Sequence, residues 1–420
     1  MKDKKIYFIL FFFFVTGTST AWIFNPGKTV PRFNQDFGLR NIELQVSSGK
    51  LWKLKNQRDA AVKTGFLSTK TEDWVKGELV EGVEKTKIEL RLKNDGSNHL
   101  KSDKWSFRIR TTDNKAWSGL RSFSLQNPAA KNHLDEWVFH QALLGEEVLS
   151  PRYDFLRVFL NGKFLGIFSI EEHYSDELLY AQNRIIAPIL RFDDESFSYA
   201  RTVISRTGNN EINKLPFVQA APIASYDSKD QKTEKFKGWI KTGQLLLNQF
   251  RYASGNCDEI FDLQTTATAL ALCDLFQENE SMAWQNQRFY YNPLNGKLEV
   301  IISGSVENNS RELLSGNFLN LTKQVNDSNA IHQPASIECL WKNQIFVQMY
   351  YRELWRMSDP SYLTNLLDAL KENLKIRQSI IREESPFYKF DATWISKNAK
   401  EIRKILESDE KYKIQPRPAG

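Results

Sequence analysis

The sequence predicts an α+β fold, and three patterns along the chain support that prediction. Apolar and polar residues alternate over Ile88–Lys93 and Lys104–Arg110, which is the period of a strand with one buried face. The pair Asn161-Gly162 separates two apolar runs and predicts a hairpin, because both residues adopt positive φ at low cost. From Ser336 onward, apolar residues recur at helical spacing. We therefore expect a mixed antiparallel sheet followed by a mainly helical C-terminal part, in two lobes at most.

The same periodicities, together with turn and boundary residues, predict the remaining elements. The expected strands are Phe155–Leu160, Phe164–Ile170, Arg288–Tyr291 and Lys297–Ile302, with a short one around Phe123 and Leu125. The expected helices are Asn132–Leu149, Asp176–Asn183, Phe236–Phe250, Glu259–Phe276, Ile337–Met357, Ser361–Ile381 and Thr393–Leu406. The chain divides into a leader (1–21), a lead-in with the first strands (22–84), a main region (85–310) and a helical extension (311–420).

The N-terminus has the features of a secretory signal peptide. A head of three lysines precedes the apolar run Ile6–Val15, and the small residues Thr16–Ala21 follow it. Ten apolar residues are too few to cross a bilayer, which takes about 20. A retained membrane anchor is the alternative. With residues 1–21 removed, we expect a chain without a transmembrane span that is secreted, periplasmic or held in the cell envelope.

Charge and cysteine content exclude several classes of protein. Lys and Arg number 57 and Asp and Glu 51, a formal net charge of +6. Removal of the signal peptide takes three lysines and one aspartate and leaves +4, an excess too small to indicate nucleic acid as a partner. Cys257, Cys273 and Cys339 match no zinc-binding pattern and allow at most one disulfide.

The strand around Lys104–Arg110 is the first candidate for chemistry. Alternation places Lys104, Ser106, Arg108 and Arg110 on one face, so three cations lie together. Like charges on one strand face repel unless something negative lies among them, and a phosphate group would serve. The alternative is an exposed edge strand, where lysine and arginine protect against aggregation.

Two acidic segments are further candidates. Glu171-Glu172-His173 follows a strongly apolar strand, and a carboxylate buried there needs a cation or a metal. The alternative is an ordinary strand end that turns into solvent. A polar loop with Glu278, Glu280 and Asn286 lies between a predicted helix and the second hairpin. Protein kinases place a catalytic loop and a metal-binding Asp in this order, although many α+β folds share it.

Several of these segments together resemble one protein family. The matching residues are Arg91–Asp95, Lys104–Arg108, Phe123–Leu125, Leu160–Gly162, Gly166–Phe168 with Glu172, and Asn286–Tyr291. They resemble the CotH family of secreted and spore-coat proteins, which have an atypical kinase fold, and the resemblance covers about residues 85–310. It implies a two-lobed, protein-kinase-like architecture and phosphoryl transfer from ATP, with Mg²⁺ or Mn²⁺, to an extracytoplasmic protein.

The resemblance also implies roles for individual residues. Lys104 would contact the ATP phosphates, with Glu172 as its ion-pair partner; Arg108 on the same strand face is the alternative cofactor-binding cation. Asn286 would contact the metal ion. Glu278 or Glu280 would serve as the catalytic base, in place of an aspartate that the loop lacks.

One departure from the family pattern lies after the second hairpin. Family members carry a metal-binding aspartate there, whereas this chain has Ser303-Gly304-Ser305. Hydroxyl groups and a glycine do not replace a carboxylate as a primary Mg²⁺ ligand. Two hypotheses follow: a secreted CotH-like kinase with impaired transfer, or an inactive pseudokinase that serves as a binding or scaffold protein of the cell envelope.

Overall fold

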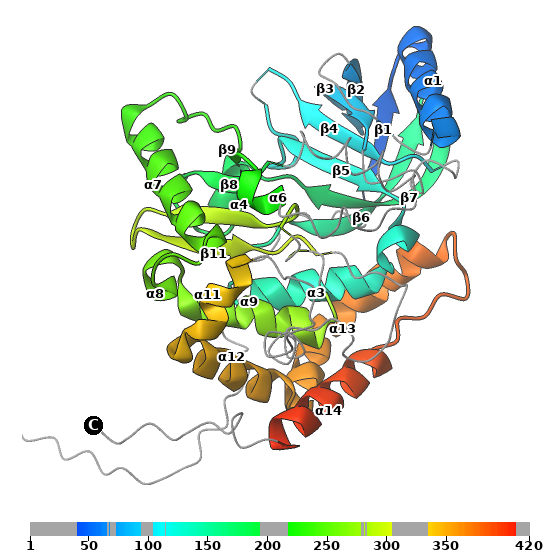
Figure 1. The fold of residues 1–420 in the computed structure, drawn as a ribbon. Coiled ribbons are helices and arrows are strands. Elements are labelled where there is room, and N and C mark those ends of the chain that lie inside the picture. Colours follow the sequence, from blue (N-terminus) through cyan, green and yellow to red (C-terminus); the bar gives the residue numbers. More distant parts are fainter. Residues whose placement is uncertain are drawn as a thin grey trace, which may run out of the picture.

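The structure, a computed structural model, confirms an α+β fold with a helical C-terminal part (Figure 1). It describes residues 40–64, 67, 73–93, 104–113, 115–193, 217–278, 281, 284–304 and 335–408. The predicted signal peptide, Glu280 and Ser305 lie outside these ranges. None of the helices in the described ranges combines the length and the apolar character needed to span a bilayer.

Seven strands form a closed barrel in the order β1-β2-β3-β4-β5-β7-β6. They are β1 (Asn41–Gln45), β2 (Val75–Glu81), β3 (Glu84–Leu92), β4 (Phe107–Thr111), β5 (Ser122–Gln126), β6 (Tyr153–Leu160) and β7 (Lys163–Glu172). Neighbouring strands are antiparallel except β1 and β6, whose parallel pairing closes the barrel. Alternate residues such as Leu90, Ile109 and Phe123 fill the interior, so the side chains between them point outward.

The hairpin predicted at Asn161-Gly162 is confirmed as the turn between β6 and β7. Asn161 has φ of 47° and Gly162 has φ of 80°, as a tight turn of this kind requires. The Asn161 side chain also accepts a hydrogen bond from the backbone N–H of Val46 and donates one to its carbonyl, both at 2.8 Å. The turn residue therefore also fixes the chain just after β1.

A second, four-stranded antiparallel sheet has the order β11-β10-β8-β9. Its strands are β8 (Ile189–Phe192), β9 (Ile223–Ser225), β10 (Arg288–Asn292) and β11 (Lys297–Ile301). The antiparallel pairing of β10 with β11 confirms the second predicted hairpin. Phe192 and Phe289 lie buried in the same core as the helices below the sheet, which fixes the sheet against them.

The helices follow the predicted pattern, except that the short η3 and α6 were not predicted and that three further differences occur. They are α1 (Ser48–Thr64), the 3₁₀ helix η3 (Pro128–Lys131), α3 (Leu134–Gly145), α4 (Asp176–Ala181), α6 (Phe217–Ala220), α7 (Glu234–Arg251), α8 (Cys257–Ile260), α9 (Leu263–Leu275), α11 (Ala335–Lys342), α12 (Gln344–Met357), α13 (Pro360–Arg382) and α14 (Thr393–Ser408). Sequence periodicity did not predict α1. Two predicted single helices are each divided, because Asp262 and Asn343 cap new helices with their side chains.

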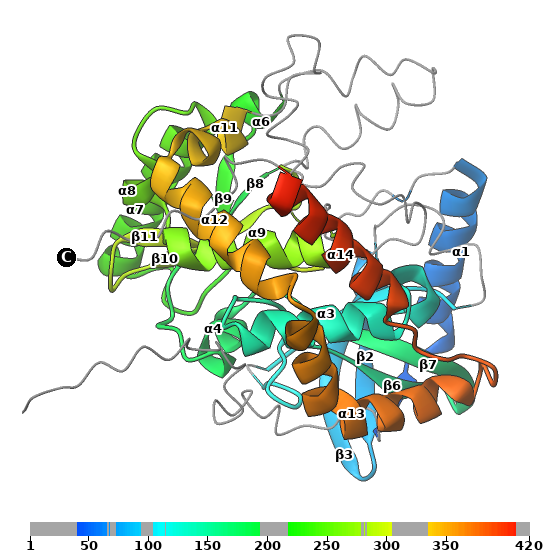
Figure 2. The ribbon, with the colours of Figure 1, turned by 90° about the horizontal axis from the view of Figure 1, so that it is seen from below.

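The helices and the second sheet share one large hydrophobic core, separate from the core inside the barrel. Helix α9 is buried around most of its circumference, and α12 packs along it (Figure 2). A disulfide between Cys257 and Cys339 joins α8 to α11, while Cys273 is a buried free thiol. The barrel is held to α13 by Arg377, whose guanidinium binds the Asp154 carboxylate at 2.7 and 2.8 Å.

Candidate functional site

The outer face of the barrel carries a row of polar residues where it meets the rest of the protein. Strand pairing aligns Arg108 on β4 with Ser124 on β5, Ser124 with Glu171 on β7, and Glu171 with Tyr153 on β6. Directly paired residues point to the same side of a sheet, and the residues between them fill the barrel interior. Because Ser124, Glu171 and Tyr153 are buried, this outer face is covered by protein rather than by bulk water.

A buried network of charged residues lies against this row. The Lys131 ammonium group is 3.2 Å from a carboxylate oxygen of Glu136, 3.4 Å from one of Glu171, and 3.1 Å from the carbonyl oxygen of Gly304. Lys93 contacts the other oxygen of Glu171 at 3.4 Å. His140 Nε2 lies 3.3 Å from the Glu136 carboxylate. We call Lys93, Lys131, Glu136, His140 and Glu171 the charge network.

Mutual compensation keeps the lysine and the carboxylate of this network charged. Burial lowers the pKa of the Lys131 ammonium, but Glu136 and Glu171 outweigh that effect, and the net pKa lies above its usual range. Burial likewise raises the pKa of Glu171, but Lys131 and Lys93 lower it more, and the net pKa lies well below its usual range. Each buried charge is therefore stabilised by the opposite charge beside it.

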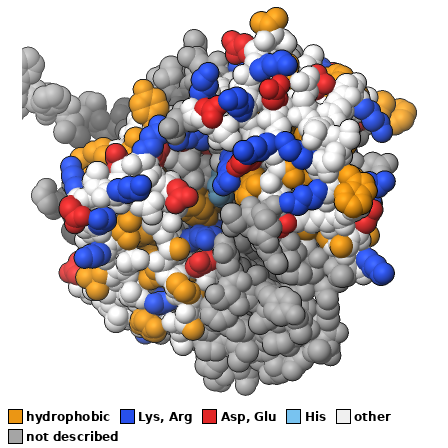
Figure 3. Space-filling model, turned by 90° about the horizontal axis from the view of Figure 1, so that it is seen from above, with side chains coloured by type: hydrophobic (Ala, Val, Ile, Leu, Met, Phe, Trp, Pro, Cys, Tyr) orange, Lys and Arg blue, Asp and Glu red, His pale blue; other side chains and the backbone are white. Residues whose placement is uncertain are grey.

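Beside the network, basic and aromatic residues from both sheets come together. We call them the junction site: Arg108, His173, Tyr174, Tyr226 and Arg288. The Arg288 Nε–H donates to the Tyr226 hydroxyl at 2.6 Å, and its guanidinium lies 5.3 Å from the centre of the Tyr174 ring. The His173 and Tyr226 rings meet edge to face, with 5.3 Å between centres. Figure 3 shows a His side chain at the middle of one face, with Lys and Arg side chains around it.

The electrostatics of the junction site favour an anion. Burial lowers the pKa of His173, and the nearby Arg108 and Arg288 lower it further, because a third positive charge there is unfavourable. Within the described residues, the half-buried guanidinium of Arg108 forms no hydrogen bond or ion pair. A guanidinium with five N–H donors suits the oxygens of a phosphate or a carboxylate.

The structure places two of the predicted features at this site and two elsewhere. Arg108 belongs to the junction site itself. The Ser303 side chain forms a hydrogen bond with the Tyr174 hydroxyl, and Gly304 contacts the charge network through Lys131. The Ser303–Gly304 turn, singled out as the position of a missing aspartate, therefore borders both groups of residues. Lys104 and Glu172 lie in other surroundings.

The predicted ion pair between Lys104 and Glu172 is wrong, because each residue has a different partner. The Lys104 ammonium donates to the Ile167 carbonyl at 2.8 Å and pairs with Glu384, just beyond α13. Glu172 follows Glu171 on β7 and so points to the opposite side of the strand. There its carboxylate accepts hydrogen bonds from the Arg152 guanidinium, at 2.5 and 2.8 Å. Burial raises the pKa of Glu172, and Arg152 offsets part of that shift.

Glu278 and Asn286 lie in the loop region before β10. Glu278 is fully buried; its carboxylate accepts a hydrogen bond from the backbone N–H of Ser281 at 3.0 Å and contacts the Cys273 thiol. Ser281 in turn accepts a hydrogen bond from the Gly304 N–H at 3.2 Å, so Glu278 supports the turn that borders the site. Asn286 is half-buried in the turn before β10. The roles of Glu278 as a base and of Asn286 as a metal ligand stay predictions.

Among the residues that the structure describes, the side chains around the Ser303–Gly304 turn do not fit Mg²⁺ or Mn²⁺; Glu307, a further acid close to the turn in sequence, lies outside those residues. Gly304 has φ of 69°, and a Cβ atom there would lie 2.4 Å from a Glu136 carboxylate oxygen and 3.0 Å from His140 Nε2. A carboxylate side chain at position 304 is therefore excluded. The acids nearest the turn, Glu136 and Glu171, are bound to Lys131. Within the described part of the chain, no group of three or more His, Cys, Asp and Glu residues is placed to hold a metal ion.

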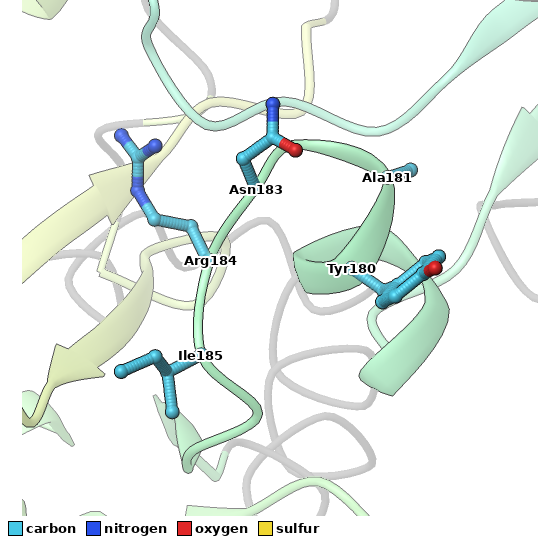
Figure 4. Close-up of a pocket in the computed structure, with 5 residues that line it drawn as sticks. All are labelled: Tyr180, Ala181, Asn183, Arg184 and Ile185. Atoms are coloured by element: carbon cyan, nitrogen blue, oxygen red, sulfur yellow. The ribbon is translucent and has the colours of Figure 1, made fainter.

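A shallow pocket follows α4 but shows no comparable chemistry. Figure 4 shows its lining residues, which are Tyr180, Ala181, Asn183, Arg184 and Ile185. The only charged member, Arg184, is already bound to Glu299 at 3.0 Å and to the carbonyl of Glu147 at 3.3 Å. Among the described residues, the pocket therefore has no unpaired cationic side chain that could bind an anionic ligand.

Sequence reasoning missed most of the charge network. Lys93 lay inside a matched motif without a role, and Glu171 was named with Glu172 only as a carboxylate that burial would pair with a cation or a metal; strand parity separates the two glutamates. Lys131 and Glu136 gave no signal, because they approach Gly304 only in three dimensions. Neither a protein-family model nor a curated protein sequence matches the chain. The site therefore rests on geometry, and the resemblance to the CotH family stays a prediction.

Proposed function

We propose that this chain is a kinase-like binding protein of the cell envelope that holds a phosphate-bearing ligand, such as ATP, at the junction site. The half-buried Arg108, which forms no hydrogen bond or ion pair within the described residues, carries the proposal. The neutral His173 and the cationic Arg288 lie beside it, and tyrosine rings offer a surface for a base or another flat group. The architecture that we propose is two-lobed, with the barrel and the helical part on either side of this site.

Impaired phosphoryl transfer is part of the proposal. The position that a metal-binding carboxylate would take is occupied by Ser303 and Gly304, and Lys131 lies between the two acids of the charge network. A kinase without its metal ligand loses the cation that neutralises the charge developing on the transferred group. The fixed ammonium of Lys131 cannot move with the nucleotide as a metal ion does. Binding or scaffolding is therefore the function we favour.

Phosphoryl transfer to a secreted or surface protein is the second candidate. It is favoured by the half-buried Asn286 ahead of β10 and by the resemblance described above. The two candidates make different predictions about metals: a kinase needs Mg²⁺ or Mn²⁺, whereas a ligand held by arginine and histidine alone does not.

Calorimetry on the purified chain from residue 22 onward tests the proposal. Titrations with ATP, ADP and inorganic phosphate are done with and without Mg²⁺ or Mn²⁺, alongside an autophosphorylation assay. We expect metal-independent binding that Arg108→Ala removes. Arg110→Ala is the matched control, because Arg110 lies on the same strand but is exposed and paired with Glu89 at 2.7 Å. Absence of binding to all three ligands would contradict the proposal, and metal-dependent autophosphorylation would establish the second candidate.

A further inference from the structure

Helix α1 presents a basic face with an exposed tryptophan to solvent. It carries five cationic residues and one acidic residue: Lys50, Lys53, Lys55, Arg58 and Lys63, with Asp59. Trp52 is 67% exposed, although tryptophan is usually at least partly covered by protein. The helix lies at the edge of the molecule in both Figure 1 and Figure 2. Trp52 and several lysines of α1 are therefore accessible with respect to the described residues.

The helical period accounts for this two-sided character. Leu54 and Ala61 are seven residues apart and buried against the barrel, which fixes the inner side of the helix. Trp52 and Lys63 are eleven residues apart, about three turns, and so lie together on the outer side. Within the described residues, Lys50, Lys55 and Lys63 form no ion pair. The outer side therefore carries Trp52, Lys55 and Lys63 together with one acid, Asp59, which pairs with Arg58 at 3.0 Å.

We propose that α1 docks the protein on an anionic membrane surface. Lysines near a layer of acidic lipid headgroups gain electrostatic attraction; Lys55 and Lys63 flank Trp52 on the outer side, and the exposed Lys50 lies in the first turn of the helix. Tryptophan favours the interface between headgroups and hydrocarbon, because its ring is apolar and its N–H stays hydrated. The partly exposed Val62 adds apolar area on the same helix. A soluble polyanion would use the lysines but gain little from Trp52 and Val62, so the combination favours a lipid surface.

Vesicle flotation with the chain from residue 22 onward tests this proposal. The vesicles are phosphatidylcholine alone or phosphatidylcholine with a third of phosphatidylglycerol, and heparin serves as a soluble polyanion. We expect binding to the anionic vesicles only. The triple variant Lys50→Gln, Lys55→Gln, Lys63→Gln should bind at least about tenfold more weakly, from the loss of three surface lysines. Trp52→Ser should weaken vesicle binding while leaving any heparin binding unchanged.

The control variant carries Lys371→Gln, Lys397→Gln and Lys400→Gln, which removes the same charge from exposed positions on α13 and α14. It should bind anionic vesicles as the unmodified chain does. The proposal is overturned if the two triple variants lose binding equally, if Trp52→Ser has no effect on vesicles, or if the unmodified chain does not float. None of the altered side chains is buried, so we expect every variant to fold. Thermal unfolding of each variant checks this expectation.

Discussion

Lys104 and Glu384 form an ion pair between residues 280 positions apart in the sequence. The Glu384 carboxylate also accepts a hydrogen bond from the backbone N–H of Ile167 at 3.0 Å, while Lys104 donates to the carbonyl of the same residue. The backbone N–H and carbonyl of Ile167 on β7 are thus both hydrogen-bonded to the side chains of this ion pair. The pair fastens the segment after α13 to the barrel, and this role differs from the phosphate contact expected for Lys104.

The first prediction concerns the role of Lys104. Lys104→Ala should lower the free energy of unfolding by roughly 1 kcal/mol, because it removes a half-buried ion pair and a hydrogen bond to Ile167. ATP binding should be unchanged. Urea unfolding and calorimetry check the two statements. Lys87→Ala is the control, since Lys87 is an exposed partner of Asp113. A loss of ATP affinity with unchanged stability would restore the phosphate-binding role.

The second prediction concerns Gly166, which lies against the same pair. Its φ is 118°, and a Cβ atom there would come within 2.7 Å of the Lys104 side chain and closer still to Glu384. Gly166→Ala should therefore destabilise the fold by about 2–3 kcal/mol through strain and displacement of the pair. Gly162→Ala is the matched control, because Gly162 also has positive φ but has open space around it. Equal unfolding midpoints in urea for the two variants would contradict the steric argument.

The third prediction concerns the charge network. Lys131→Met leaves Glu136 and Glu171 without their shared cation and should cost about 3–5 kcal/mol at neutral pH. The pKa of Glu171 lies below its unfolded value, so its stabilisation is present above about pH 4.3 and disappears as pH falls through the folded pKa. The variant loses the share of this dependence that comes from Lys131, while Lys93 still lowers the pKa of Glu171. The stability deficit of the variant relative to the unmodified chain should therefore shrink toward acid pH. Chemical unfolding between neutral and acid pH measures the difference.

The fourth prediction concerns pH and ligand binding. In the free protein, burial and the nearby arginines hold the pKa of His173 well below its usual value, so the ring is neutral. A bound anion raises that pKa, so binding takes up a proton and the affinity increases as pH falls through the pKa of His173 in the complex. Calorimetry in buffers of different ionisation enthalpy measures the proton uptake. The His173→Gln variant should still bind the ligand but lose the proton uptake that is due to His173. Proton uptake or release by the ligand itself should be the same in both proteins.

The fifth prediction concerns the turn at Ser303–Gly304. Ser303→Asp places a carboxylate beside Tyr174, but we expect no recovery of autophosphorylation with Mg²⁺ or Mn²⁺. The new carboxylate would meet the fixed ammonium of Lys131, which contacts Gly304 next to it. Ser303→Asn is the uncharged control of similar size. Transfer of labelled phosphate by the aspartate variant alone would identify an otherwise intact kinase.

Local patterns predicted most of the secondary structure, because they depend on few residues. The Asn161-Gly162 turn and the hairpin of β10 and β11 follow from turn chemistry and strand period. Helix α1 escaped prediction because only Leu54 and Ala61 are deeply buried along it, which leaves no continuous apolar stripe. The breaks at Asp262 and Asn343 depend on side-chain caps inside otherwise regular helical patterns.

The candidate site was harder to predict, because it depends on contacts between distant segments. Arg108 was found because strand alternation places it among other cations on one face. The expected pairing of Lys104 with Glu172 fails because Glu172 faces the barrel interior, where Arg152 binds it, whereas the neighbouring Glu171 faces outward to Lys93 and Lys131. The contact between Lys131 and Gly304 spans 173 residues, and no local pattern in the sequence encodes it.

The disulfide between Cys257 and Cys339 has a consequence for limited proteolysis. It closes a loop of chain with a sequence separation of 82 residues. One peptide bond cleaved anywhere inside that loop leaves the two fragments covalently joined, so the protein migrates as one species until a reductant is added. A nicked sample would therefore pass as intact on a non-reducing gel, with the helices beyond Cys339 still attached to the barrel.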